Sequence, residues 1–176
     1  MRVMPEITVV AHNIRSTHNV GAIFRTCEGF GVKKIILSGY TPYPLVKNDT
    51  RLPHIRDKIT TQIHKTALGA EVLVPFEYVP DIAAWFDQNE QYEKLPVIAL
   101  EQTPKSIALP TFRPPQKIAL LLGEEVHGIP NELLARCQDS IEIPMSGKKE
   151  SFNVSVATGI ALYALTTSSR YIHSQK

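Results

Sequence analysis

The sequence contains few cysteines and no long apolar run, and both absences exclude classes of protein. Cys27 and Cys137 are the only cysteines, and they form no CxxC or Cys/His spacing. A disulfide framework and a zinc site are therefore not expected, and the composition fits a reducing cytoplasm. No run reaches the ~18 apolar residues of a membrane-spanning helix, and the N-terminal apolar run is too short for a signal peptide. We expect a cytoplasmic protein that uses neither a membrane nor a metal.

The sequence also lacks the common motifs for nucleotide cofactors. No GxGxxG follows the first apolar run, and no GxxxxGK(S/T) occurs anywhere. Because these glycines form the turns that hold phosphates, their absence argues against a dinucleotide-dependent dehydrogenase and against a P-loop enzyme.

What the sequence does contain indicates one domain with an uneven charge. The 176 residues are 43% hydrophobic, enough for a core, and we expect a single domain over residues 1–176 without a separate RNA-binding extension. Residues 1–60 carry a net charge of +5, residues 61–110 carry −4 and residues 111–176 carry +1. A basic N-terminal third indicates an anionic partner that binds one face. The alternative is a solvated surface whose asymmetry has no function.

Short apolar runs alternate with helix-like segments along the chain. The pattern predicts strands at residues 6–11, 33–39, 71–76, 95–101, 117–123 and 140–145. It predicts helices at residues 20–31, 55–69, 80–88, 130–137 and 153–168, and Pro-rich stretches at 41–54 and 104–115. Strands that are apolar throughout and alternate with helices predict an α/β fold with a mainly parallel sheet flanked by helices.

Three polar segments follow predicted strands, at residues 12–26, 123–130 and 145–155. If these strands are neighbours, the segments converge on one edge of the sheet, where parallel sheets bind ligands. Gly123 comes directly after the most apolar strand and would let a ligand approach the backbone closely.

The same segments contain side chains that suit an anionic substrate. Arg25 has a planar donor fork that fits a phosphate or a carboxylate, although many helix arginines are surface residues. Asn19 is either a functional residue or an ordinary helix cap. One helix cap needs a single polar side chain, yet the last predicted helix begins with Ser151, Asn153 and Ser155.

Together, the three segments resemble the SpoU (TrmH-like) branch of the SPOUT RNA methyltransferases. The family's first motif is an Asn followed six residues later by Arg-Thr, and here it spans residues 19–26. Its second is an apolar strand followed by GxExxG, at residues 120–128. Its third is IPMxG, a spacer and SLNVS, at residues 143–155, with Phe152 in place of the usual Leu. All three occur in order and at the family spacing, over almost the whole chain.

This resemblance implies a homodimer with a deep C-terminal trefoil knot, in which the last helix is threaded through a loop. The knot would hold S-adenosylmethionine, and by motif position the cofactor site would be formed by Leu100, Gly123, Ile143, Met145 and Phe152. The implied reaction is methyl transfer to a ribose 2′-OH of RNA.

The resemblance also implies catalytic roles. Arg25 would either activate the 2′-OH as a base or clamp a phosphate and stabilise the developing oxyanion. The high pKa of a guanidinium, above ~12, makes the first role costly. The ribose and Arg25 would be positioned by Asn19, Glu125, Ser151 and Asn153, some of them from the partner subunit.

We expect the catalytic domain itself to hold the RNA, through the basic N-terminal third and the 41–54 segment. The candidate contacts are Arg15, Lys47, Arg51 and Arg56. We expect tRNA as the substrate and hence a role in tRNA processing. The alternatives are an rRNA 2′-O-methyltransferase of the same fold, a non-catalytic knotted RNA-binding protein, and a generic α/β enzyme for a small molecule.

Overall fold

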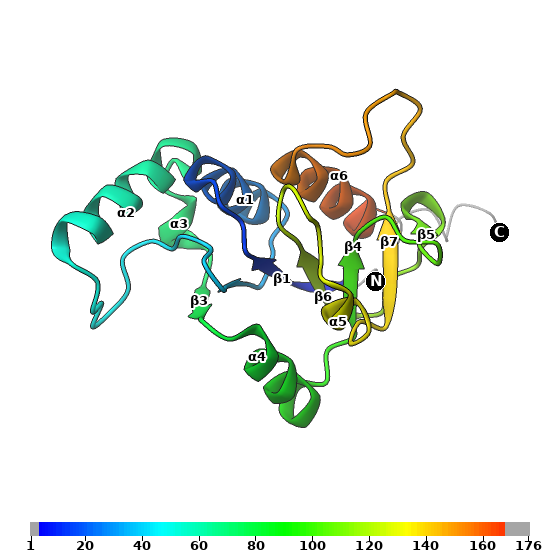
Figure 1. The fold of residues 1–176 in the computed structure, drawn as a ribbon, viewed down its shortest axis with the longest axis horizontal. Helices are drawn as coiled ribbons and strands as arrows, with labels where there is room; N and C mark the ends of the chain where they lie inside the picture. Colours follow the sequence, from blue (N-terminus) through cyan, green and yellow to red (C-terminus); the bar gives the residue numbers. More distant parts are fainter. Residues whose placement is uncertain (1–3, 168–176) are drawn as a thin grey trace.

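A seven-stranded sheet organises the computed structural model, which describes residues 4–167 (Figure 1). The strands are β1 Glu6–His12, β2 Lys34–Ser38, β3 Phe76–Val79, β4 Val97–Leu100, β5 Ile107–Ala108, β6 Lys117–Leu122 and β7 Asp139–Glu142. Their order across the sheet is β3-β2-β1-β6-β4-β7-β5, and every neighbouring pair is parallel. The prediction of an α/β fold with a mainly parallel sheet is therefore confirmed.

Helices cover both faces of the sheet. They are α1 Thr17–Gly29, α2 Pro53–Ala67, α3 Ala70–Leu73, α4 Ile82–Gln88, α5 Asn131–Leu134 and α6 Val154–Thr167, with a π-helix at Asn89–Glu93 and a 3-10 helix at Leu109–Thr111. In Figure 1, α1, α2, α3 and α6 lie on one side of the strands, and α4 and α5 lie on the other. Ser168, the last residue of the predicted C-terminal helix, lies outside the described residues.

Successive strand residues enter two different cores. Val9 is buried against the α1 and α6 side, whereas Val10 is buried against the α4 and α5 side. Because side chains alternate across a strand, a sheet covered on both faces needs apolar residues at every position. This explains why the central strands are almost entirely apolar, with Thr8 of β1 as a buried polar residue.

The contact between α1 and α2 depends on a glycine. A Cβ atom on Gly21 would lie 2.2 Å from the Ile63 carbonyl oxygen and 2.1 Å from Thr66 Oγ1. Thr66 in turn donates a hydrogen bond from Oγ1 to the carbonyl oxygen of His18, at 2.9 Å. The two helices therefore meet backbone to backbone near the start of α1.

The strand predicted at residues 71–76 is wrong. Residues Ala70–Leu73 form the short helix α3, and β3 begins only at Phe76. The Glu71 carboxylate accepts a hydrogen bond from the Gly69 N–H at 3.0 Å and so stabilises the helical turn. Val72 and Leu73 are apolar but 81% and 67% exposed, so the apolar run at these positions does not mark a buried strand. The two-residue strand β5 lies inside the Pro-rich stretch and had no strand pattern of its own.

The last strand is inserted between two earlier ones. The chain forms β4, crosses to β5 at the sheet edge, and returns to β6 beside β1. It then places β7 between β4 and β5, where Ile141 is paired with both Leu100 and Ile107. The carboxyl ends of β4, β6 and β7 consequently lie together. Among residues 4–167, no helix has the length and apolar character needed to cross a membrane.

Candidate functional site

The three polar segments meet at the carboxyl edge of the sheet, as predicted. β1 and β6 are direct neighbours, and the segments that follow them are joined by Glu125. Its Oε2 accepts a hydrogen bond from the Arg15 N–H at 3.1 Å, and its Oε1 accepts bonds from the Ser16 N–H at 3.4 Å and from Asn19 Nδ2 at 3.0 Å. Glu125 therefore fixes the first turn of α1 to the end of β6.

Asn19 extends this network to the third segment. Its Oδ1 accepts a hydrogen bond from Asn153 Nδ2 at 3.2 Å. Ser16, not Asn19, caps α1, because the Ser16 hydroxyl accepts the Asn19 N–H at 3.2 Å. Asn153 precedes α6, and its Oδ1 accepts both the N–H and the hydroxyl of Ser155, at 2.9 and 2.7 Å. The Asn19 side chain is left to connect two motifs that are 134 residues apart.

The Glu125 carboxyl is held in its ionised form. Burial raises its pKa, but the hydrogen bonds from Asn19 and from the backbone N–H groups of Arg15 and Ser16 outweigh that effect and lower the pKa below its usual value. A carboxylate that already accepts three bonds is a poor base. The geometry therefore gives Glu125 a positioning task.

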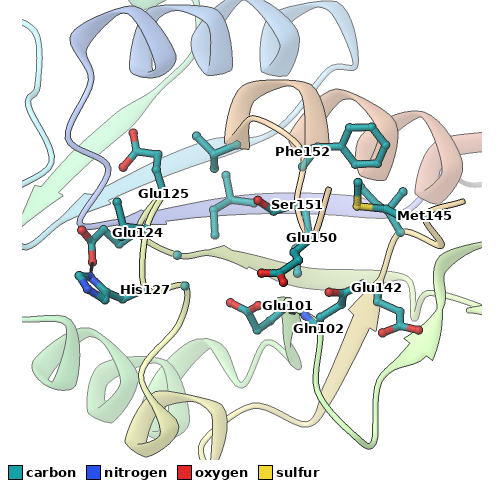
Figure 2. A pocket seen from close by; sticks show the side chains of 18 of the residues that line it. Glu101, Gln102, Glu124, Glu125, His127, Glu142, Met145, Glu150, Ser151 and Phe152 are labelled. Carbon is teal, nitrogen blue, oxygen red and sulfur yellow. Dashed lines mark hydrogen bonds and ion pairs between the residues drawn. The ribbon is translucent and has the colours of Figure 1, made fainter. Parts of the chain in front are cut away.

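A cavity of about 270 Å³ opens beside this network, at the ends of β4, β6 and β7. All five residues predicted for the cofactor site line it: Leu100, Gly123, Ile143, Met145 and Phe152. Glu125 and Ser151 line it too, whereas Asn19 and Asn153 lie behind Glu125 and not in its wall. Figure 2 shows Phe152 and Met145 toward one end, and Glu124, Glu125 and His127 toward the other.

The cavity wall is strongly acidic. It contains five glutamates and one histidine and, among the described residues, neither lysine nor arginine. The histidine, His127, is paired through Nδ1 with Glu124 Oε2 at 2.8 Å. Of the five, only Glu125 was predicted from the sequence as a site residue, and Glu101, Glu124, Glu142 and Glu150 were not. For Glu101 a signal existed, since it directly follows an apolar strand, as functional residues in parallel sheets do.

The turn after β6 is packed too closely for a larger residue at its start. A Cβ atom on Gly123 would lie 2.6 Å from the Gly128 carbonyl carbon and from Ile129 Cγ1. The Gly128 N–H donates to the Glu124 carbonyl oxygen at 3.0 Å and closes the turn. Gly123 therefore lets the turn fold back on itself, and it lines the cavity.

Arg25 is not brought to this cavity by its own chain. It lies on the exposed side of α1 and is absent from the cavity wall. Within residues 4–167, its guanidinium has no hydrogen-bond or ion-pair partner. The catalytic role of Arg25 stays a prediction, and a single chain does not explain it.

The four candidate RNA contacts fall into two groups. Arg15 and Lys47 are exposed, and Arg56 is half-buried and paired with Asp57 at 3.3 Å. Arg51 is engaged inside the 41–54 segment, where it donates to the carbonyl oxygens of Tyr43 and Pro44 at 2.9 and 3.1 Å.

Further contacts hold the Arg51 side chain in place. It pairs with Asp49, with 2.9 Å between Nε and Oδ1, and its guanidinium lies 3.7 Å from the centre of the Tyr43 ring. The side chain is only 16% exposed. RNA binding by all four residues stays a prediction, and Arg51 has in addition a structural task that the sequence did not reveal.

Comparison with known proteins identifies the family. The model of the SpoU rRNA Methylase family matches residues 6–163. The chain belongs to the SpoU methylase family.

Named relatives of this SpoU chain act on both main classes of RNA. It is 31% identical over 161 residues to the Mus musculus tRNA (guanosine(18)-2'-O)-methyltransferase TARBP1, covering 91% of this chain and 9% of that protein. It is 29% identical over 159 residues to the Nitrosomonas europaea 23S rRNA (guanosine-2'-O-)-methyltransferase RlmB, covering 90% and 55%. The chain thus spans about a tenth of the length of the first relative and about half of the length of the second.

Solved structures support the fold of the SpoU chain. The SpoU methyltransferase AviRb from Streptomyces viridochromogenes, in complex with AdoMet, matches 97% of this chain and 60% of its own, with a TM-score of 0.78 and 19% identity. At that identity the likeness concerns the fold, and the parallel sheet and its helices are shared with this methyltransferase.

Proposed function

We propose that the protein is an S-adenosylmethionine-dependent methyltransferase that methylates a ribose 2′-OH of RNA, with tRNA as its substrate. The observation that carries the proposal is the hydrogen-bonded chain from Glu125 through Asn19 to Asn153. It joins all three family motifs at the mouth of one cavity. A generic small-molecule enzyme would not need these side chains to meet.

The cavity suits S-adenosylmethionine in size and chemistry. Its volume of about 270 Å³ is close to the roughly 300 Å³ at which ligand pockets begin. Leu122, Ile141 and Phe152 offer an apolar wall to an adenine ring, and the glutamates offer negative charge to a sulfonium and an ammonium group. Gly123 lines the cavity without a side chain of its own. These residues would hold the cofactor, which supplies an electrophilic methyl group.

The chain's own residues would position the nucleophile. Asn19 is fixed from both sides, by Glu125 and by Asn153, and Ser151 lies in the cavity wall. We assign these groups the task of orienting the ribose and Arg25, since orientation provides much of the rate of a transfer reaction. Arg25, free of partners within the described residues, would bind the adjoining phosphate and stabilise negative charge on the 2′-oxygen.

We further propose that the enzyme is a homodimer in which Arg25 of one protomer serves the cavity of its partner. Two observations support this assembly. Arg25 does not reach the cavity of its own chain. The helix α6 and the segment before it present exposed apolar side chains, with Val156 50%, Tyr163 62% and Phe152 41% exposed, as a surface buried in a dimer would.

A C-terminal trefoil knot belongs to the same proposal. β7 lies between β4 and β5, which precede it in the chain and are joined by residues 101–106. The last strand, β7, is therefore placed between two strands whose connection is formed earlier in the chain, and α6 follows it. This order supports a C-terminal segment that is threaded through a loop. A cytoplasmic location and a reaction without metal also stay predictions.

RNA binding would use exposed or partly exposed basic residues of the N-terminal third. Arg15 precedes α1 near the cavity, while Lys47 and Arg56 lie in and after the 41–54 segment. Contacts to phosphates release counterions, so affinity should fall steeply with salt. An RNA affinity that is equal at low and high salt would contradict this part of the proposal.

The experiment is methyl transfer from labelled S-adenosylmethionine to separate tRNA and rRNA pools, followed by nucleoside mass spectrometry. We expect a 2′-O-methylated nucleoside from tRNA and almost none with Arg25→Ala. A product from rRNA alone would replace the tRNA assignment with the rRNA one. An active Arg25→Ala variant would refute the role of Arg25, and failure to bind the cofactor at all would favour a non-catalytic RNA-binding protein.

A further inference from the structure

Glu101 lies where three walls of the cavity come together. It directly follows β4, and its N–H donates to the Ile141 carbonyl oxygen of β7 at 3.0 Å. Its own carbonyl oxygen accepts the Ser106 hydroxyl at 2.8 Å, which fixes the start of the crossover toward β5. The main chain of Glu101 is therefore held on both sides, and its side chain leaves from a rigid base.

The Glu101 carboxylate reaches from β4 across to the turn after β6. Its Oε2 accepts the Ile129 N–H at 2.9 Å, and its Oε1 accepts the Gln102 N–H at 3.0 Å. Ile129 is 5% exposed, so its N–H needs a protein acceptor. Within residues 4–167, no other side chain from outside this turn accepts a hydrogen bond from the backbone of residues 123–129.

Gly128 makes room for this contact. Its φ angle is +69°, and a Cβ atom there would lie 2.3 Å from Glu101 Oε2. The second glycine of the GxExxG motif thus has a steric task that is specific to the Glu101 carboxylate, in addition to its backbone conformation.

We infer that Glu101 is a positioning residue that sets the shape of the cofactor cavity by tying the 123–129 turn to the end of β4. This inference rests on the proposed function for its effect on the cofactor. The contact itself does not depend on that function. Without the carboxylate, the turn that contains Gly123, Glu124 and Glu125 would lose its side-chain hydrogen bond to the end of β4.

The test compares three substitutions at one position. Glu101→Ala removes the acceptor, Glu101→Asp keeps the charge but shortens the side chain by one methylene, and Glu101→Gln keeps the length and one acceptor oxygen. Amide hydrogen exchange at Ile129 reports the contact, and calorimetry with S-adenosylmethionine reports the cavity. The matched control is Glu142→Ala, which removes a carboxylate from the same cavity wall without touching the turn.

We expect Glu101→Ala and Glu101→Asp to speed Ile129 exchange and to raise the Kd for S-adenosylmethionine by about tenfold, with a smaller fall in kcat. In Glu101→Gln, the Ile129 exchange rate and the Kd for S-adenosylmethionine should both stay within about threefold of their wild-type values. Glu142→Ala should leave Ile129 exchange unchanged, because a loss of charge alone does not release the turn.

Unchanged Ile129 exchange in Glu101→Ala would overturn the inference, and so would faster exchange with an unchanged Kd. A wild-type protein that binds no S-adenosylmethionine would instead refute the proposed function, and the exchange data would still decide whether Glu101 holds the turn. Gly128→Ala adds an independent check. Its effect on Ile129 exchange should be smaller in the Glu101→Ala background, where the 2.3 Å contact is absent.

Discussion

Replacing Gly21 by alanine tests whether α1 and α2 meet as closely as the structure describes. The added Cβ would lie 2.2 Å from the Ile63 carbonyl oxygen, which belongs to the backbone of α2. A backbone oxygen cannot rotate away as a side chain can. The helices must therefore separate by about 1 Å to restore an ordinary carbon–oxygen contact of roughly 3.2 Å.

Two terms determine the size of the effect. Overpacking of this kind destabilises a protein by about 3 kcal/mol at its upper end, whereas replacing a helix-interior glycine by alanine stabilises it by about 1 kcal/mol. The net loss is about 2 kcal/mol. In a chain of this length it corresponds to a fall in Tm of about 4–8 °C.

Thermal unfolding followed by circular dichroism measures this shift, and Gly29→Ala is its control. Gly29 is the last residue of the same helix, and a Cβ there would meet nothing within 4 Å. We expect Gly29→Ala to leave Tm unchanged or to raise it. A Gly21→Ala variant as stable as the wild type, or an equal loss in both variants, would refute the close contact between the helices.

Other contacts lead to three further expectations. Arg51→Met should lower both Tm and RNA affinity, because it removes the contacts that hold the 41–54 segment. Arg51→Lys keeps the charge but not the planar donor fork, so it should not restore Tm. Full recovery of Tm by Arg51→Lys would indicate a purely electrostatic role. Burial raises the pKa of Glu71, but hydrogen bonds from His64 and the backbone lower it below the ordinary 4.5. The Tm gap between wild type and Glu71→Gln should therefore be full above pH 4.5 and shrink as the pH falls; a gap that grows in acid would contradict this sign. Tyr163→Glu should convert a dimer into monomers in analytical ultracentrifugation, and an unchanged dimer would exclude this face as the interface.

Much of the fold follows from local sequence patterns. Continuous apolar runs such as residues 118–122 predict strands that are covered on both faces, and the structure buries all five residues. The error at residues 71–76 has the opposite cause, because Val72 and Leu73 are apolar without being buried. The helix that contains them depends on the preceding turn and on the hydrogen bond from the Gly69 N–H to the Glu71 carboxylate. The spacing of apolar residues along the sequence does not reveal either feature.

The site was predicted in part for a similar reason. The three motifs could be placed at strand ends from the sequence, and their convergence follows once β1, β6, β4 and β7 are neighbours. The contact of Glu101 with Ile129 and the internal bonding of Arg51 could not be predicted. Both join side chains to backbone groups whose positions depend on the path of the loops.

The sequence by itself determined the class of the fold, the segments that carry the chemistry and the family, because periodicity and motif spacing are properties of neighbouring residues. Only the tertiary structure decided which of those residues touch. It joins Asn19 to Glu125 and Asn153, gathers five glutamates around one cavity, and leaves Arg25 outside it. The order of strands in the sheet decides these contacts, and it includes the pairing of β1 with β6, whose residues are more than a hundred positions apart.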